Sequence, residues 1–236
     1  MSEPVVNETA QVARTFAFFD VDDTVVRIKT MFSFQDYYYT HTGLLPSLLG
    51  KRKAQRFEAR RQGYLAAGRP REDLNRMYYR TWRGRRPEEV AELARRWYDQ
   101  TRAMPGGLYF PGALRALREH QDAGHEIVFV SGSMVDILRP IADELGVTCL
   151  LATRVVAENG RYTGEIVPPQ TIGAGKAEAV RTFLADAGAA GADCWAYGDD
   201  RSDVPMLSEV GHPVLVSDRA EIAELARERG WRLVRP

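Results

Sequence analysis

The sequence predicts an α/β fold in which a parallel sheet carries helices on both faces and a helical segment is inserted near the start. Three observations predict it. Apolar, strand-like runs alternate with helix-like segments through the second half of the chain, which is typical of a parallel sheet with right-handed crossovers. A separate apolar run, Phe16–Phe19, precedes them near the N-terminus. Between the two lies a stretch with helical spacing that is rich in Arg, Tyr and Trp.

The inserted stretch also differs in charge from the rest of the chain. From Ile28 to Phe110 there are 17 Lys and Arg against 8 Asp and Glu, whereas the remainder has 15 against 24. Spacing and breaks predict four helices here, and Pro87 suits the first turn of the last one. The four are expected at about Met31–His41, Leu45–Tyr64, Arg71–Trp82 and Pro87–Ala103.

Strands and helices alternate after the break at Pro105-Gly106-Gly107. Gly124 and Gly146 stop two helices, and Asn159-Gly160 is a strong hairpin-turn signal. The strands expected in the whole chain are Phe16–Phe19, His125–Val130, Thr148–Thr153, the hairpin strands Arg154–Ala157 and Arg161–Val167, Asp193–Tyr197, Pro213–Val216 and Trp231–Val234. The helices expected after the break are Pro111–Ala123, Met134–Leu145, Lys176–Ala187, Val204–Val210 and Arg219–Arg229.

The first strand ends in an unusual concentration of acidic residues, Asp20-Val21-Asp22-Asp23-Thr24. Carboxylates this close repel one another, so we expect a divalent cation between them. Side chains alternate along an extended backbone, so Asp20 and Asp22 start on the same side and can face one site. Asp23 would face elsewhere.

Two further predicted strands end in polar residues, and one lysine lies near the start of a helix. These are Ser131-Gly132-Ser133, Gly198-Asp199-Asp200 with Asp203 following, and Lys176. In an open parallel sheet the ligand crevice lies beyond the carboxyl ends of the strands, so these side chains are expected to share one site. Acidic clusters, a hydroxyl group and a lysine together suit a Mg²⁺ ion and a phosphoryl group.

The four motifs, in this order and on these elements, resemble the haloacid dehalogenase superfamily. The resemblance is to its phosphoserine-phosphatase-like branch (subfamily IB), in which a helical C1 cap is inserted after the first motif. Asp20 to Thr24 matches the family's DxDxT, Ser131 its second motif, Lys176 its third, and Gly198 to Asp203 its GDxxxD. The match covers nearly the whole chain. It implies a Rossmann-like catalytic core in residues 1–28 and 107–236 and a cap domain in residues 29–106.

The resemblance implies a Mg²⁺-dependent phosphatase acting on a phosphate monoester of a small metabolite. Asp20 would be the nucleophile that forms an aspartyl-phosphate, and Asp22 would be first the general acid and then the general base. Lys176 would neutralise charge on the nucleophile and the phosphoryl group. The residues expected to bind phosphate are Ser131, Gly132 and Thr24. The expected metal ligands are Asp20, Asp22 through its carbonyl oxygen, and Asp199, with Asp200 and Asp203 as candidates for an outer shell.

Several of these residues also have a purely structural interpretation. Ser131 could cap the helix that starts near Met134, and Asp200 and Asp203 could cap the helix near Val204. Asp203 could restrain Lys176 instead of completing the metal shell. Lys176 could be an exposed first-turn lysine, although a cation is poorly placed at a helix N-terminus unless an anion is near.

Substrate choice is expected to depend on the insertion, and Lys29 departs from the related phosphoserine phosphatases. Those enzymes carry a glutamate five residues after the motif threonine, which recognises the amino group of the substrate. A lysine cannot favour an ammonium group, so phosphoserine is expected to be a poor substrate. Lys29, with Arg27, would favour an anionic or polyol leaving group; the alternative is a solvated hinge residue. Arg56, in the basic run Lys51–Arg61, is a further candidate for an anionic substrate.

Other features limit the class and location of the protein. No apolar run approaches the roughly 20 residues that span a bilayer, and Met1 to Gln11 has no apolar core typical of a secretory signal. We therefore expect a cytoplasmic protein with no membrane partner. The acidic core opposes the binding of a polyanion, so no nucleic-acid partner is expected either. The protein is expected to be a monomer or a homodimer. Two alternative functions use the same acidic pair: a phosphomutase or phosphotransferase on this scaffold, and a non-hydrolytic phosphoryl-accepting signalling module.

Overall fold

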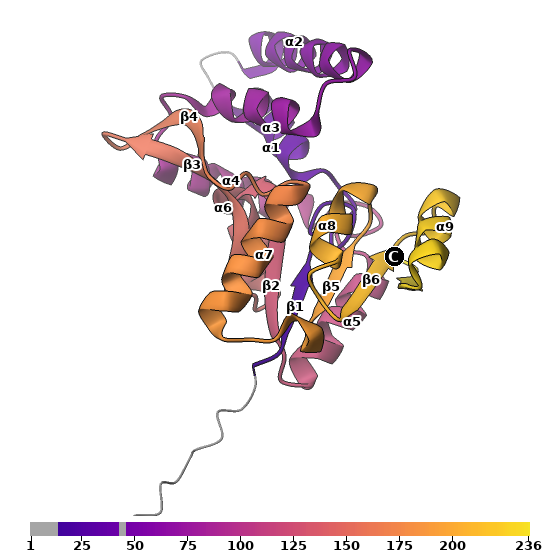
Figure 1. Cartoon of the computed structure of the whole chain (residues 1–236). Coiled ribbons are helices and arrows are strands. Elements are labelled where there is room, and N and C mark those ends of the chain that lie inside the picture. The colour runs from indigo at the N-terminus through magenta and orange to yellow at the C-terminus, as the bar shows by residue number, and fades with distance from the viewer. Residues whose placement is uncertain (1–13, 43–45) are drawn as a thin grey trace, which may run out of the picture.

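The predicted α/β fold is confirmed by the computed structural model, which describes residues 14–42 and 46–236, with the backbone alone for 46–49. In the described chain the strands form one sheet in the order β4-β3-β2-β1-β5-β6-β7, parallel except for the β3–β4 hairpin. The strands are β1 (Phe16–Phe19), β2 (Glu126–Met134), β3 (Cys149–Glu158), β4 (Arg161–Val167), β5 (Trp195–Gly198), β6 (His212–Val216) and β7 (Arg232–Val234). The first strand thus lies in the middle of the sheet (Figure 1).

Helices cover both faces of the sheet because the buried strands are apolar on both sides. Phe16 and Phe18 of β1 face one hydrophobic cluster, with α7, α8 and α9, whereas Ala17 and Phe19 face the other, with α5 and α6. This alternation follows from the two-residue period of a strand. The helices are α5 (Pro111–Asp122), α6 (Val135–Glu144), α7 (Ala174–Ala187), α8 (Val204–Leu207) and α9 (Ala220–Arg229).

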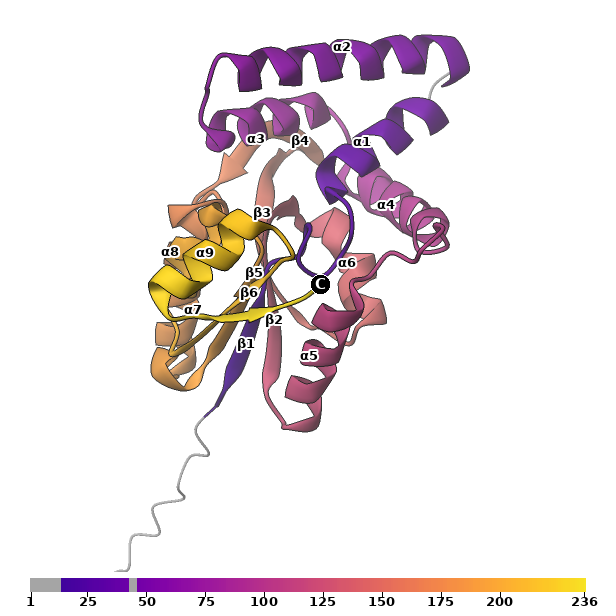
Figure 2. The same cartoon turned by 90° about the vertical axis from the view of Figure 1, so that its right-hand side faces the viewer.

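The helical insertion follows β1 and lies beyond the carboxyl ends of the strands (Figures 1 and 2). Its elements are α1 (Thr30–His41), α2 (Pro46–Ala66), α3 (Arg71–Tyr79), the 3₁₀ turn η1 (Arg80–Trp82) and α4 (Pro87–Thr101). Buried aromatic side chains of α1, α3 and α4 join the same hydrophobic cluster as α5 and α6. Helix α2 is the outermost element of the insertion in both views.

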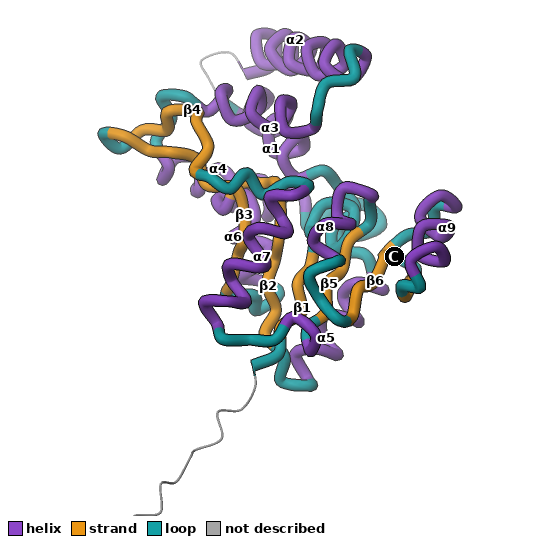
Figure 3. Tube along the Cα trace, in the orientation of Figure 1, coloured by secondary structure: helices purple, strands orange, loops and turns teal. Residues whose placement is uncertain are grey.

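The β3–β4 hairpin supports the insertion from the side (Figure 3). The backbone N–H of Gly84 donates to the carbonyl of Tyr162 at 2.7 Å, and the N–H of Tyr162 donates to the carbonyl of Arg85 at 2.8 Å. These bonds attach the loop between η1 and α4 to the edge strand of the sheet. The insertion therefore covers part of the edge of the sheet that β4 would otherwise expose.

The structure differs from the predicted elements mainly at their ends. Strand β2 does not end at Val130 but continues through the polar residues to Met134, pairing with β3 across a register shift between Ser131 and Met134. The predicted strands at 148–153 and 154–157 are one strand, β3, which pairs parallel to β2 and then antiparallel to β4. The helix predicted at 71–82 changes to a 3₁₀ turn after Tyr79, and the one predicted at 204–210 ends at Leu207.

Two predictions fall on residues outside the described ranges. They are the lack of a secretory signal in Met1 to Gln11 and the start of the second inserted helix at Leu45. Among the helices of the described residues, none is long and apolar enough to cross a membrane.

Candidate active site

A pocket of about 250 Å³ lies where the carboxyl ends of β1, β2 and β5 meet the insertion. The core lines it with the predicted motif residues, and α1, α2 and α3 supply its other walls. The core residues that line it are Asp20, Asp22, Ser131, Gly132, Ser133, Ile172, Lys176, Asp199, Asp200, Ser202 and Asp203. The four motifs predicted to share one site therefore meet in one pocket.

A tight turn after β1 separates the two carboxylates that the sequence places two residues apart. Asp20 continues the pairing of the sheet, since its N–H donates to the carbonyl of Tyr197 at 2.9 Å. The carbonyl of Val21 then accepts from Thr24, Val25 and Val26, which reverses the chain. Asp23 takes a left-handed conformation with φ +62° in this turn, a conformation that Asp and Asn tolerate better than most residues.

Lys176 lies buried between two carboxylates. Its Nζ is 2.7 Å from Oδ1 of Asp20 and 2.7 Å from Oδ1 of Asp203. Burial by itself lowers the pKa of Lys176, but the two carboxylates outweigh it and hold the pKa above its usual value. The lysine is therefore charged at neutral pH. These anions explain why a cation is stable in the first turn of α7, and its burial excludes the exposed interpretation.

Lys176→Met is expected to destabilise the metal-free fold by about 3–5 kcal/mol at pH 8, because it leaves two buried carboxylates without their cation. Without the lysine, burial would hold the pKa of Asp20 still further above its unfolded value. The folded variant would bind protons that the unfolded chain releases, so its deficit relative to wild type should shrink as the pH falls from about 8 to about 5. Urea unfolding of both proteins in EDTA at several pH values measures this. A deficit independent of pH would contradict it.

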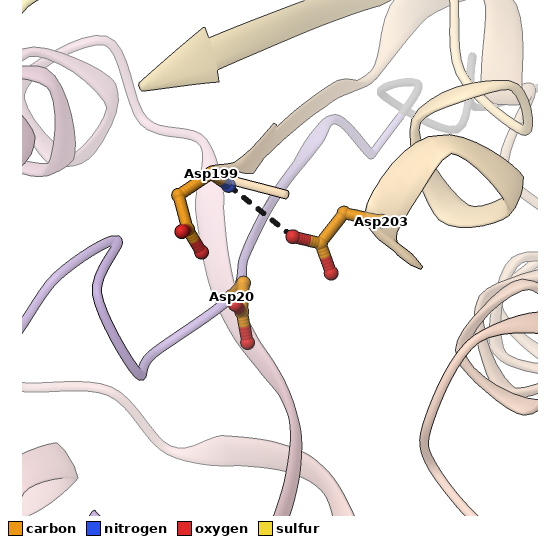
Figure 4. A group of neighbouring side chains, drawn as sticks. All are labelled: Asp20, Asp199 and Asp203. Atoms are coloured by element: carbon orange, nitrogen blue, oxygen red, sulfur yellow. Dashed lines mark hydrogen bonds between the residues drawn. The ribbon is translucent and has the colours of Figure 1, made fainter. Parts of the chain in front are cut away.

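Three buried carboxylates converge on one point of the pocket. Oxygens of Asp20, Asp199 and Asp203 all lie within 4.8 Å of one another (Figure 4). Burial, with the nearby Asp203, raises the pKa of Asp199 to about 6, and burial also raises the pKa of Asp20. Such a cluster is unfavourable without a cation in addition to Lys176, and hard oxygen donors are the ligands that divalent metal ions such as Mg²⁺ prefer. The trio can therefore hold a divalent metal.

Asp22 has different surroundings from Asp20. Its Oδ1 accepts from the hydroxyl of Thr30 at 2.7 Å and from the N–H of Thr30 at 3.2 Å. The hydroxyl of Ser133 is 2.5 Å from that of Thr30 and 3.5 Å from Oδ2 of Asp22. Burial raises the pKa of Asp22, although these hydrogen bonds oppose the shift. Asp22 thus lies in a hydroxyl-lined position at the start of α1, apart from the lysine.

Two of the predicted phosphate-binding residues line the pocket and one does not. Ser131 and Gly132 lie in its wall. Ser131 does not cap α6, because its Oγ accepts from the N–H of Ser133 at 3.1 Å and the helix has Met134 as its N-cap residue. Thr24 is buried behind the wall, where its hydroxyl donates to Oδ1 of Asp199 at 3.3 Å. The geometry brings Thr24 to the carboxylate trio and not to the pocket surface.

Asp200 and Asp203 form a reciprocal cap on the turn that starts at Arg201. Oδ1 of Asp200 accepts from the N–H of Ser202 at 3.0 Å, and Oδ2 of Asp203 accepts from the N–H of Asp200 at 3.2 Å. Asp203 also accepts from Nζ of Lys176. It therefore both caps this turn and restrains Lys176, the two structural roles that the sequence suggested for it. The side chain of Asp200 is directed to this cap and to Arg71, which donates to it at 2.9 Å.

The three candidate substrate residues lie in different places. Lys29 lines the pocket, where its Nζ is 2.7 Å from Oδ2 of Asp23. Arg27 lies outside the pocket, with its guanidinium stacked 4.8 Å from the ring centre of Phe110. Arg56 is exposed on α2 and is not part of the pocket wall.

Other basic residues that sequence reasoning missed do reach the site. Arg61 of α2 and Arg71 of α3 line the pocket, and Arg219 lies 3.1 Å from Oδ2 of Asp199. Arg56 and Arg61 belong to the same basic run of α2, and the sequence does not distinguish them. Only the position of α2 in the fold shows that Arg61 is the one that lines the pocket. Arg219 follows Ser217 and Asp218 after β6, a segment that matches none of the four motifs, so no motif points to it.

Comparisons with known proteins find a matching family and several similar proteins. Residues 17–208 match the model of the haloacid dehalogenase-like hydrolase family. A probable phosphatase of Mycobacterium tuberculosis is 31% identical over 94% of this chain and 76% of that protein. A phosphoserine phosphatase of the same organism is 32% identical over 92% of this chain and 69% of that protein. A crystal structure from Bordetella pertussis, of a protein with unknown function, has a TM-score of 0.80 at 25% identity and covers 94% of this chain and 98% of its own.

Proposed function

Because the chain belongs to the haloacid dehalogenase-like hydrolase family, with phosphoserine-phosphatase-like relatives, we propose that it hydrolyses a phosphate monoester of a small metabolite with Mg²⁺ and an aspartyl-phosphate intermediate. The class, a phosphatase of this family, rests on the family match and on relatives named phosphatases. The metal identity, the covalent intermediate, the roles of the residues and the substrate are the proposed parts.

The different surroundings of Asp20 and Asp22 carry the proposal. Asp20 touches the cation of Lys176, which lowers its pKa against the larger effect of burial and orients the carboxylate oxygen that would attack phosphorus. Asp22 is held by hydroxyl groups, and burial raises its pKa, which suits a group that must carry a proton before it donates one. Two neighbouring carboxyl groups with different partners, one beside a cation and one among hydroxyl groups, suit the separate roles of nucleophile and acid.

The reaction then has two displacements. A carboxylate oxygen of Asp20 bonds to phosphorus as the ester P–O bond breaks, and Asp22 gives its proton to the leaving oxygen. Asp22, now a carboxylate, takes a proton from a water molecule that attacks the phosphorus of the aspartyl-phosphate. The P–O bond to Asp20 breaks, and inorganic phosphate leaves. Lys176 and Ser131 would bind the phosphoryl oxygens, where charge develops.

A divalent ion, proposed to be Mg²⁺, would be held by Asp20, Asp199 and the carbonyl oxygen of Asp22. When bound, it supplies positive charge to the phosphoryl oxygens. The insertion, proposed as a cap domain in residues 29–106, would close over the pocket and exclude water from the leaving group.

Lys29 and Asp23 support a substrate other than phosphoserine. The related phosphoserine phosphatases have a glutamate at the position of Lys29 and often a small residue at the position of Asp23. Here Nζ of Lys29 and Oδ2 of Asp23 form an ion pair at 2.7 Å. Both positions thus depart from that pattern together. The proposal is an anionic or polyol leaving group.

A panel of phosphate esters, assayed for release of free phosphate with Mg²⁺, tests this function. Hydroxy-acid or polyol phosphates are expected to have a kcat/KM at least about tenfold above that of phosphoserine. One favourable or unfavourable contact with a charged group is enough for a difference of this size. The double variant Asp23→Gly/Lys29→Glu should reverse the preference, because it restores a carboxylate toward the substrate without leaving two acids in contact. Glycine also suits the positive φ at position 23.

The controls separate the alternatives. Efficient turnover of phosphoserine by the wild type, or a double variant with unchanged preference, would refute the substrate proposal. Transfer of phosphate to a second sugar or metabolite without free phosphate would indicate a phosphomutase or phosphotransferase. Stable phosphorylation by a small phosphodonor with no turnover would indicate a signalling module.

A further inference from the structure

The carbonyl oxygen of Gly132 accepts hydrogen bonds from three side chains. Tyr79 donates through its hydroxyl at 2.6 Å, Asn75 through Nδ2 at 3.0 Å, and Thr153 through its hydroxyl at 2.9 Å. A carbonyl oxygen has two lone pairs, so three donors make this an unusually constrained peptide group. Thr153 belongs to β3 of the sheet, whereas Asn75 and Tyr79 both belong to α3 of the insertion.

The two donors from α3 are themselves fixed. Asn75 is 4% exposed, and its Oδ1 accepts from Nε2 of Gln170 at 2.8 Å, which directs Nδ2 toward Gly132. Tyr79 is fully buried, and burial holds its pKa well above the usual value, so the phenol remains a donor. Neither side chain has the freedom to adopt another arrangement while α3 stays in place.

The constrained peptide lies in the wall that is proposed to bind phosphate. The Gly132 carbonyl and the Ser133 N–H belong to the same peptide plane, and that N–H donates to Oγ of Ser131 at 3.1 Å. Ser131 therefore accepts through its oxygen, and its own hydrogen remains available to a phosphoryl oxygen. The regular pairing of β2 with β3 shifts register between Ser131 and Met134. Where the hydrogen bonds between β2 and β3 are irregular, side-chain hydrogen bonds to the Gly132 carbonyl hold the backbone instead.

Helix α3 also contacts the other two loops of the site. Arg71, at its N-terminus, donates to Asp200 at 2.9 Å and to the hydroxyl of Ser202 at 3.0 Å. Gln170, in the loop before α7, donates to the carbonyl of Glu72 at 2.9 Å. One helix of the insertion thus touches the segments that carry Ser131, Lys176 and Asp199.

We propose that Asn75 and Tyr79 are positioning residues, which set the orientation of the Gly132–Ser133 peptide and so make phosphate binding depend on α3 being docked on the core. This inference rests on the proposed function. When α3 is undocked, the Gly132 carbonyl keeps one donor of three and Ser131 loses its fixed orientation. The phosphate-binding wall is then complete only while the insertion covers the pocket.

Calorimetric titration of inorganic phosphate into the Mg²⁺-loaded protein tests the proposal without requiring turnover. Tyr79→Phe and Asn75→Ala are each expected to raise the Kd of phosphate about tenfold, the loss of one well-ordered hydrogen bond. The KM of a turned-over ester should rise in the same proportion, with a smaller change in kcat. The Mg²⁺ concentration for half-maximal activity should stay constant.

Tyr78→Phe is the matched control. Tyr78 is the neighbouring buried tyrosine, and its hydroxyl has no hydrogen-bond partner among the described residues. Its removal should leave the Kd of phosphate within twofold of wild type. The proposal is overturned if Tyr79→Phe binds phosphate as wild type does, or if Tyr78→Phe weakens binding equally. A wild type that neither binds phosphate nor hydrolyses any ester would instead refute the proposed function.

Discussion

Asp20→Asn is expected to lower phosphate release by at least about 10,000-fold while the fold remains intact. The amide nitrogen and oxygen of asparagine cannot form the acyl phosphate, and the substitution also removes one oxygen of the carboxylate trio. The fold should survive, because Asp20 is a buried carboxyl group whose charge is unfavourable there and asparagine has the same shape. Lys176 retains Asp203 as its partner. Release of phosphate from p-nitrophenyl phosphate and urea unfolding measure the two parts.

Asp23→Asn is the control for this variant. Asp23 lies in the same turn, three residues along, but contacts Lys29 at the pocket edge instead of Lys176. Asparagine tolerates its positive φ. Its activity on p-nitrophenyl phosphate should remain within a few-fold of wild type. Substantial activity in Asp20→Asn, or an equal loss in Asp23→Asn, would show that Asp20 is not the nucleophile.

Removal of the metal is expected to have the second large effect. EDTA should abolish phosphate release, and added Mg²⁺ should restore it. Because the ion binds buried carboxylates that exist together only in the folded chain, Mg²⁺ at about 100 times its Kd should stabilise the fold by about 2.7 kcal/mol. For a chain of this size that raises Tm by roughly 5–10 °C.

Asp199→Asn should remove both responses to Mg²⁺, because it takes one carboxylate from the trio. Asp193→Asn, on the exposed turn before β5, should keep both. Asp200→Asn separates the two interpretations of that residue: asparagine still caps the Ser202 N–H, so a retained Mg²⁺ response assigns Asp200 to the cap. A wild-type activity that resists EDTA, or a Tm that Mg²⁺ does not change, would contradict a metal at the trio.

Much of the fold was predictable because its signals are local. The Phe16–Phe19 run before three acids, the Asn159-Gly160 turn and the glycines that stop helices each identify an element or its end within a few residues. The ends of β2 and β3 were not predictable in the same way. Polar residues 131–133 belong to β2 because β3 lies beside them, and residues 148–157 form one strand because β2 and β4 provide partners at its two ends.

The four motifs could likewise be brought to one pocket from sequence, since the carboxyl ends of parallel strands meet at one edge of a sheet. The partners of those residues could not. Asp23 pairs with Lys29, Thr24 donates to Asp199, and Arg61 lines the pocket, whereas the sequence suggested Arg56. Each of these contacts depends on how helices and strands are oriented relative to one another, which a short stretch of sequence does not determine.

By itself, then, the sequence determined the α/β class, the inserted helices and the identity of the residues that gather at the strand ends, because hydrophobic period, turn chemistry and motif spacing are properties of neighbours along the chain. The tertiary structure alone decided which groups touch: Lys176 between Asp20 and Asp203, Asp22 among the hydroxyls of Thr30 and Ser133, and α3 on the Gly132 carbonyl. These contacts join residues that are 8 to 156 positions apart in the sequence. Their distances of 2.6–3.5 Å arise only after the helices, strands and loops have packed against one another.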